Sequence, residues 1–270
     1  RLNRIRRGFE DLYPAGDSSP LEMLAKTLSD AGFCDDKPAT DEIYRQTILP
    51  DPELAELYRE GVSNILSHWQ SSVVDRVRSL MHWTGLWTVL LMTSSASGVA
   101  SGKRIGLLTD CAGVHPQLRR AAQRSYKQHL RNIEEASNIK ASELGGDLSN
   151  QQLGKIRGYF GNTAVSCGLG NSWKGRRHLT LRLEAIDALV MAGIPQDGEM
   201  EFDRFISDWV YHRCRIVVGR EAAQCEQLLT DLDSTIFEEN ERALSEQMHM
   251  AGMLRMYSDA TRMVSCGSDR

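Results

Sequence analysis

Asp110, Cys111 and His115 are the residues whose types could together support catalysis, with the Cys111 thiolate as the nucleophile. They follow the apolar segment 104–109, which is short enough to form one buried strand. Reactive side chains of α/β enzymes often lie where a strand ends. One strand does not define such a sheet, however, and an isolated cysteine is commonly a small buried thiol. Catalysis at these residues is therefore the third of three functional hypotheses.

A run of glycines beside basic residues could cradle phosphate groups. These glycines are Gly154, Gly158, Gly161, Gly168, Gly170 and Gly175. A P-loop needs a glycine followed by Lys and then Ser or Thr, whereas here Lys174 comes before the last glycine and Arg176 after it. A dinucleotide-binding loop needs a glycine at the position that Trp173 occupies. Neither motif is present, and we expect no cofactor.

The histidines and cysteines show no spacing typical of a metal site. The sequence contains no HExxH motif, and His212 with Cys214 supplies only two ligands. Asp231 and Asp233 precede several glutamates, but Asp233 or Ser234 is better explained as the N-cap of a helix. We therefore expect no metal site. Because the cysteines are scattered along the chain without a paired spacing, we also expect reduced thiols and a cytoplasmic protein.

The strongest signal is the sorting of charge along the chain. The net charge is −4, but residues 1–102 sum to −4, residues 103–183 to +9 and residues 184–270 to −9. No Asp or Glu occurs from Leu148 to Leu183, a window that contains Lys155, Arg157, Lys174, Arg176, Arg177 and Arg182. Sorted charge indicates either an anion-binding face or a basic middle that packs on the acidic C-terminal part. The sequence leaves both possibilities open.

Pro116 begins the clearest helix of the chain. At about 100° per residue, its apolar side chains cover one side, while a narrow arc on the opposite side contains Arg120, Arg124, Lys127 and Arg131. We name these four residues the basic stripe. Like charges at such spacing destabilise a helix slightly unless an anion meets them. The alternative is an ordinary solvated helix face.

A second basic cluster precedes a helix expected from about His178. It consists of Lys174, Arg176 and Arg177, and Trp173 beside it could stack on a base. Backbone amides and the dipole of a helix N-terminus favour anions at such a position. Alternatively, the glycines form tight turns and the arginines pair with acids of the C-terminal part.

The elements that must position these residues are mainly helices. We expect helices from about 20, 52, 72, 116, 178, 202, 222 and 235, single strands at 104–109 and 215–218, a linker at 138–152 and a terminal hairpin at 253–265. The pattern predicts a helical N-terminal domain (1–147), a basic glycine-rich connector (148–177) and an acidic helical C-terminal domain (178–270). Helices followed by a hairpin resemble a winged-helix arrangement in topology.

These patterns favour a non-enzymatic subunit of a larger complex. The basic stripe and the second cluster would bind phosphates of nucleic acid, and the acidic C-terminal part would contact a protein. The alternative is a protein-protein interaction or scaffold component that binds no nucleic acid. The longest nearly apolar run, 83–92, is about half the length of a membrane span, so we expect no membrane partner.

Overall fold

The computed structural model describes residues 2–12, Thr27, Asp30 and residues 51–102, 104–113, 115–172, 176–257 and 261–266. Within these ranges the chain is mainly helical with a few short strands, as the sequence predicted. The helix expected from about residue 20 lies outside the described residues, as do Trp173 and Lys174.

The α-helices are α1 (Leu2–Leu12), α4 (Pro52–Ser67), α5 (Val73–Ser101), α6 (Pro116–Glu143), α7 (Asn150–Ser166), α8 (Leu183–Gly193), α9 (Phe202–Arg204), α10 (Arg220–Cys225) and α11 (Ser234–Met250). A π-helix, η1 (Phe205–Arg213), continues α9, and a 3-10 turn, η2 (Leu228–Thr230), follows α10. The strands are β1 (Leu107–Leu108), β2 (Met200–Glu201), β3 (Ile216–Val217), β4 (Leu254–Met256) and β5 (Arg262–Val264).

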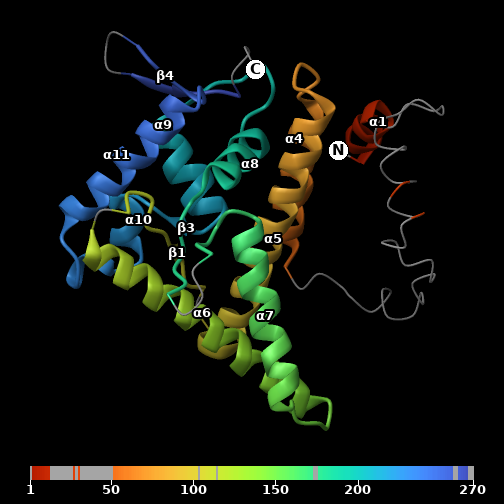
Figure 1. Ribbon diagram of the computed structural model, residues 1–270, viewed down its shortest axis with the longest axis vertical. Coiled ribbons are helices and arrows are strands. Elements are labelled where there is room, and N and C mark those ends of the chain that lie inside the picture. Colours follow the sequence, from red (N-terminus) through yellow and green to blue (C-terminus); the bar gives the residue numbers. More distant parts are fainter. Residues whose placement is uncertain are drawn as a thin grey trace.

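Helix α5 lies at the centre of the molecule and packs against α4, α6, α7 and α8 (Figure 1). Its inner side chains, among them Trp83, Leu86 and Val89, are fully buried. The Trp83 ring lies directly over Gly61 of α4, where a Cβ atom would clash with it. The glycine therefore permits the close approach of the two helices.

The strands form two small sheets. β1 and β3 are parallel, with Leu107 opposite Ile216 and Leu108 opposite Val217. β4 and β5 form the expected antiparallel hairpin at the end of the chain, and β2 adds a third strand along β5. Both single strands and the hairpin were predicted, whereas β2 was not. The parallel pair is the part of the fold that supports the candidate site.

The prediction of a linker at 138–152 was wrong for most of this range. α6 continues to Glu143, and α7 begins at Asn150 behind a capping box of Ser149 and Gln152. The capping box and the burial of Phe160 outweigh the cost of about 1 kcal/mol per helical glycine. Most of the expected connector is therefore helix, and α7 extends beside α6 at the bottom of Figure 1.

The main core crosses the boundaries that the charge pattern suggested. One cluster of buried apolar side chains runs from Leu12 to Val264 and includes Phe160 of α7. A second cluster joins β1 and β3 to the N-terminal half of α6, α10 and α11, with Leu118 and Phe237 fully buried. The division into domains at 147 and 177 stays a prediction.

Asn240 of α11 fixes the ends of the parallel strands. Its Nδ2 donates to the carbonyl oxygens of Thr109 (3.1 Å) and Val218 (2.9 Å). Its Oδ1 accepts from the backbone N–H groups of Cys111 (2.7 Å) and Ala112 (3.2 Å). One fully buried side chain thus satisfies four backbone groups, three of them in buried hydrogen bonds.

We expect Asn240→Ala to lower the free energy of unfolding by about 3 kcal/mol or more, because buried backbone groups would lose their partners. Urea denaturation measures this change. Asn138→Ala, at an exposed position of α6, is the matched control and should change stability by less than about 0.5 kcal/mol. Equal effects of the two substitutions would contradict this role of Asn240.

Candidate anion-binding site

The first wall of the site is the N-terminal half of α6. Pro116 occupies the first helical turn, where its missing N–H costs no hydrogen bond, and no acidic residue follows in that turn. Leu118, Ala122 and Tyr126 are buried, as the helical spacing predicted. All four residues of the basic stripe are exposed.

The second wall consists of residues 171–172 and 176–182, which lie between α7 and α8 in the sequence. Asn171 closes a loop: its Oδ1 accepts from the N–H of His178 (2.9 Å), and its Nδ2 donates to the carbonyl of Arg176 (3.1 Å). A β-bridge between Gly170 and Leu179 continues this pairing. The segment is therefore extended from Arg176 to α8, where a helix was expected from about His178.

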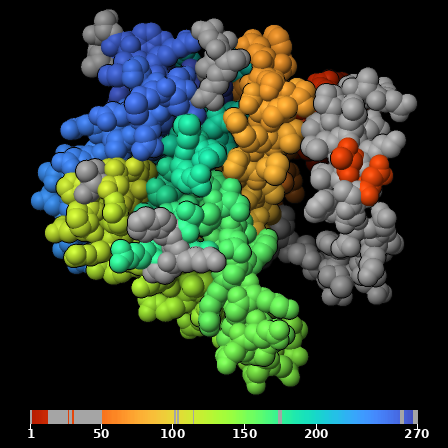
Figure 2. All heavy atoms as spheres, in the orientation of Figure 1, coloured from red at the N-terminus to blue at the C-terminus, as the bar shows by residue number. Residues whose placement is uncertain are grey.

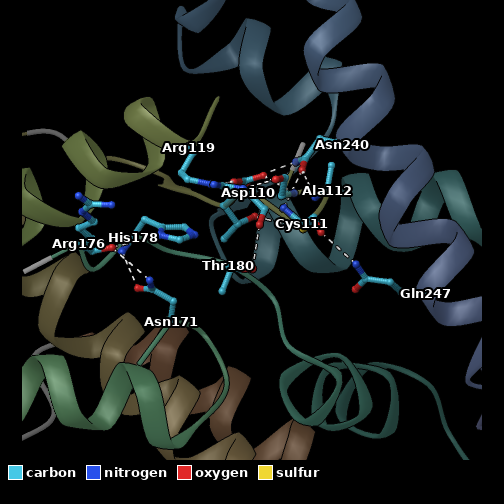
Figure 3. Close-up of polar contacts among 12 residues, drawn as sticks. Asp110, Cys111, Ala112, Arg119, Asn171, Arg176, His178, Thr180, Asn240 and Gln247 are labelled. Carbon is cyan, nitrogen blue, oxygen red and sulfur yellow. Dashed lines mark hydrogen bonds and ion pairs between the residues drawn. The ribbon is translucent and has the colours of Figure 1, made fainter. Parts of the chain in front are cut away.

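Asp110, at the end of β1, joins the two walls (Figure 3). Its side chain is fully buried and accepts from the N–H of Gly113 (2.8 Å) and from Nε of Arg119 (3.4 Å) on α6. Its backbone N–H donates to Leu179 (3.0 Å), and its carbonyl accepts from Oγ1 of Thr180 (2.8 Å). The position of each wall thus depends on the turn that follows β1.

Between the walls lies a pocket of about 850 Å³, which we name the arginine pocket. In Figure 2 the segment that precedes α8 lies against α6 on the face in view. The pocket is lined by Pro116, Arg119, Arg120, Gln123, Asn171, Ser172, Arg176, His178, Thr180 and Arg182. Four of these residues are arginines, and none of the described lining residues is acidic.

The arginines of the pocket differ in how far they are neutralised. Arg119 lies beside Asp110, and Arg182 pairs with Glu184 of α8 at 3.0 Å. Arg120 and Arg176 form no ion pair with any residue that the structure describes. These two side chains come from the two basic clusters that the sequence singled out, and the pocket brings them together.

The other three residues of the basic stripe line a different cavity. This cavity has a volume of about 900 Å³ and lies on another side of α6, beside η2; we name it the α6–η2 pocket. Arg124, Lys127 and Arg131 line it together with the acidic residues Glu134, Glu226 and Asp231. The stripe therefore borders two pockets, of which only the arginine pocket lacks acids.

The Arg177 side chain packs against α7 and does not line the arginine pocket. Its guanidinium donates to Oδ1 of Asn162 (3.3 Å) and packs over Gly161, where a Cβ atom would clash with it. Arg177 was expected to bind anions beside Arg176. Trp173 and Lys174, expected in the same role, lie outside the described residues.

The three residues considered for catalysis have separate partners. Cys111 is buried, and burial raises the pKa of its thiol to about 12. His115 pairs with Glu239 of α11, while Asp110 pairs with Arg119. A thiol with such a pKa carries almost no thiolate at neutral pH, so this geometry does not favour a nucleophilic cysteine.

The sequence did not indicate several residues that line the arginine pocket. Arg119 lies about 100° away from Arg120 around α6, and this angle placed it outside the basic stripe. Arg182 stands directly before α8, so only the path of the preceding loop brings it to Arg176. Asn171 and His178, in contrast, belong to the segment before α8 for which the sequence predicted anion binding.

No protein-family model matches this chain, and searches of curated proteins and of solved structures found no significant match. The described residues contain no group of three or more His, Cys, Asp or Glu side chains that could bind a metal ion. Across the same ranges, every helix is too short or too polar to cross a membrane.

His129 of α6 lines the α6–η2 pocket and is fully buried. Its Nε2 lies 3.2 Å from the carbonyl oxygen of Gly106. Nε2 therefore carries the proton, and Nδ1 is left as an acceptor. Burial lowers the pKa of His129 from 6.5 to about 4, because desolvation disfavours the charged ring.

The low pKa of His129 makes stability depend on pH. Between pH 6.5 and 4 the unfolded chain binds this proton more readily than the folded chain. Above pH 6.5 this group does not lower the free energy of unfolding. As the pH falls from 6.5 toward 4, the free energy of unfolding decreases by about 3 kcal/mol. Desolvation lowers the pKa of His68 as well, which acts in the same direction.

His129→Gln retains a donor for Gly106 and removes the titrating ring. We expect its free energy of unfolding to fall less than that of the unsubstituted protein between about pH 7 and pH 4.5, by about 2 to 3 kcal/mol. Urea denaturation at both pH values measures the difference. The same pH dependence in both proteins would show that His129 is not buried in its neutral form.

Proposed function

We propose that the chain binds nucleic acid through phosphate contacts in the arginine pocket and along the basic stripe. The observation that supports this most strongly is the pocket itself. It combines four arginines and His178 from two distant segments, and its described lining contains no acid.

The donors of the pocket suit phosphate oxygens. Guanidinium groups present planar N–H pairs that bind phosphate in a bidentate manner. Arg120 and Arg176 are free of ion pairs with the described residues, so an anion need not displace a carboxylate from them. The N-terminal turn of α6, with no acid of its own, adds a favourable dipole.

The length of the basic stripe favours a polyanion over a single phosphate group. From Arg120 to Arg131 the helix axis extends about 16 Å. One strand of nucleic acid places a phosphate about every 3.4 Å of a regular helix. A strand can therefore contact several of these cations at once. Phosphate contacts alone supply affinity without reading the base sequence.

Neutralisation within the chain is the competing explanation for the basic middle. Several acids of the C-terminal part pair with arginines of the same part, as in Arg215–Glu226 (2.6 Å) and Arg262–Asp203 (2.6 Å), while Glu239 pairs with His115. No carboxylate among the described residues pairs with Arg120, Arg124 or Lys127. The ion pairs thus favour an external anion.

The acidic C-terminal part, residues 178–270, completes the proposal as the surface for a protein partner. Its net charge is unfavourable for phosphates except where Arg182 and His178 face α6. The terminal hairpin with the preceding helices is the winged-helix-like element of this part, a resemblance in topology alone. A protein-binding component without nucleic acid remains the alternative function.

We expect the double substitution Arg120→Glu and Arg176→Glu to weaken binding of a single-stranded oligonucleotide by about tenfold or more at low salt. The slope of log affinity against log salt should become shallower by roughly 0.7 for each lost phosphate contact. Fluorescence anisotropy measures both quantities. The melting temperature should not fall, because neither guanidinium group forms an ion pair with a described residue.

The matched control is Arg4→Glu with Arg7→Glu on α1, which makes the same change of net charge at exposed positions far from α6 (Figure 1). Its affinity should stay within about threefold of the unsubstituted protein. An equal loss in both double variants would mean that net charge alone governs binding. Loss of folding in the pocket variant would support internal neutralisation instead.

A further inference from the structure

The positive charge of the arginine pocket is only partly balanced within the chain. Two of its four arginines form ion pairs with carboxylates, namely Arg119 with the buried Asp110 and Arg182 with Glu184. The other two, Arg120 and Arg176, form no ion pair with a described residue, and both are exposed. If each carboxylate offsets one guanidinium group, the charges of these two arginines remain. The pocket is therefore matched to an anion that carries about two negative charges.

A phosphate at the end of a strand carries such a charge. Terminal phosphates are phosphomonoesters, with a charge of about −1.5 to −2 at neutral pH and three free oxygens. A phosphate within a strand carries one negative charge and has two free oxygens. An internal phosphate would thus leave part of the charge of Arg120 and Arg176 without a partner, whereas a terminal phosphate would not.

The shape of the pocket also favours the end of a strand. Arg120 comes from α6 and Arg176 from the second wall, so a bound phosphate meets donors from two sides. A phosphomonoester can accept from both walls because only one ester bond has to leave the pocket. An internal phosphate has two ester bonds, and the strand must leave the concave surface in two directions. The volume of about 850 Å³ suits a terminal phosphate with the nucleoside that carries it.

The pocket lies where the basic stripe begins. The part of α6 that lines it, from Pro116 to Gln123, forms the first two turns of the helix, and the first turn contains no acid. Arg120 belongs to both the stripe and the pocket, so a strand that contacts the stripe can place its end in the pocket. The rest of the stripe shares its cavity with three acids, Glu134, Glu226 and Asp231. Of the two pockets, the arginine pocket is therefore more favourable for the most highly charged group of a strand.

We propose that the arginine pocket binds the terminal phosphate of a single strand, as a phosphomonoester dianion, between the guanidinium groups of Arg120 and Arg176. This inference rests on the proposed binding of nucleic acid and names the group that occupies the pocket. The internal phosphates of the same strand contact the remainder of the basic stripe. A free phosphomonoester such as AMP offers the same dianion without a strand, and the test separates these two sources.

The test compares single strands of about twelve nucleotides that differ at their ends. One strand has a hydroxyl group at both ends, and two others carry a phosphate at the 5′ or the 3′ end. A fourth strand has hydroxyl ends and two additional nucleotides, so its additional charge lies on internal phosphates. Each strand has a fluorescent label on an internal base, and anisotropy titrations with the full chain are done at one salt concentration.

Two substitutions change the pocket but not the rest of the basic stripe. Arg176→Gln removes one unpaired guanidinium group, and Ser172→Glu places a carboxylate in the lining. The matched controls are Arg131→Gln and Ser142→Glu, which make the same changes on α6 outside this pocket. All four positions are exposed, so each variant should fold, and melting curves check this. If one pocket variant does not fold, the other still decides the matter.

We expect a phosphate at one of the two ends to raise affinity about tenfold, because it adds charge-assisted hydrogen bonds in the pocket. The longer strand should gain less than about threefold over the hydroxyl-ended strand. Each pocket variant should reduce the gain from the terminal phosphate to less than about threefold, whereas both controls should keep it. AMP should compete with the phosphorylated strand only at millimolar concentrations, because AMP makes no contacts with the rest of the stripe.

Equal affinities of the longer strand and both phosphorylated strands would overturn the terminal-phosphate subsite and leave the proposed binding of nucleic acid intact. A gain that both pocket variants retain would also overturn it, because the terminal phosphate would then bind elsewhere. If no strand binds, the proposed function fails and the strand end is overturned as the ligand. Micromolar binding of AMP in that case would identify a free phosphomonoester as the source of the dianion.

Discussion

The hydrogen bonds of Asn240 are the constraint on which the candidate site depends. This one side chain joins α11 to the ends of β1 and β3 and to the turn that begins at Asp110. Asp110 in turn holds Arg119 of α6 and Thr180 of the returning loop. The two walls of the arginine pocket come from segments about sixty residues apart in the sequence, and this buried polar network sets their separation. Gln247, about two helical turns after Asn240 on α11, supports the same turn. Its side chain donates to the carbonyl oxygen of Cys111 (2.9 Å).

The apolar core and the basic residues lie on different faces of α6. α5 and the apolar faces of α4, α6 and α8 form the core, so the outer face of α6 is free of packing requirements. Cations can then collect there because stability does not depend on their partners. Helix propensity is little affected by Arg or Lys, and the mild repulsion among them costs only tenths of a kcal/mol per pair. An anion that bridges them removes even this cost.

Much of α6 could be predicted from sequence because its period is regular and Pro116 marks its start. β1 and β3 were also predicted, from local apolar runs, but their parallel pairing was not, since pairing depends on contacts between residues about 110 positions apart. α7 was not predicted because its glycines suggested a linker, although Ser149 and Gln152 form a capping box at its start. The sequence did not predict that Arg120 and Arg176 line one pocket, because this depends on the path of the chain between α7 and α8. Arg177 shows why: beside Arg176 in sequence, it turns to Asn162 instead.

The most direct measurement follows the arginine side chains themselves. In an NMR titration of the full chain with a single-stranded oligonucleotide, the Nε–Hε signals of Arg120 and Arg176 should shift together along one binding curve, while the signal of Arg7 on α1 stays unchanged. That result would place one anion in contact with both walls of the arginine pocket. Shifts of Arg120 without Arg176, or shifts confined to arginines outside the pocket, would contradict the account.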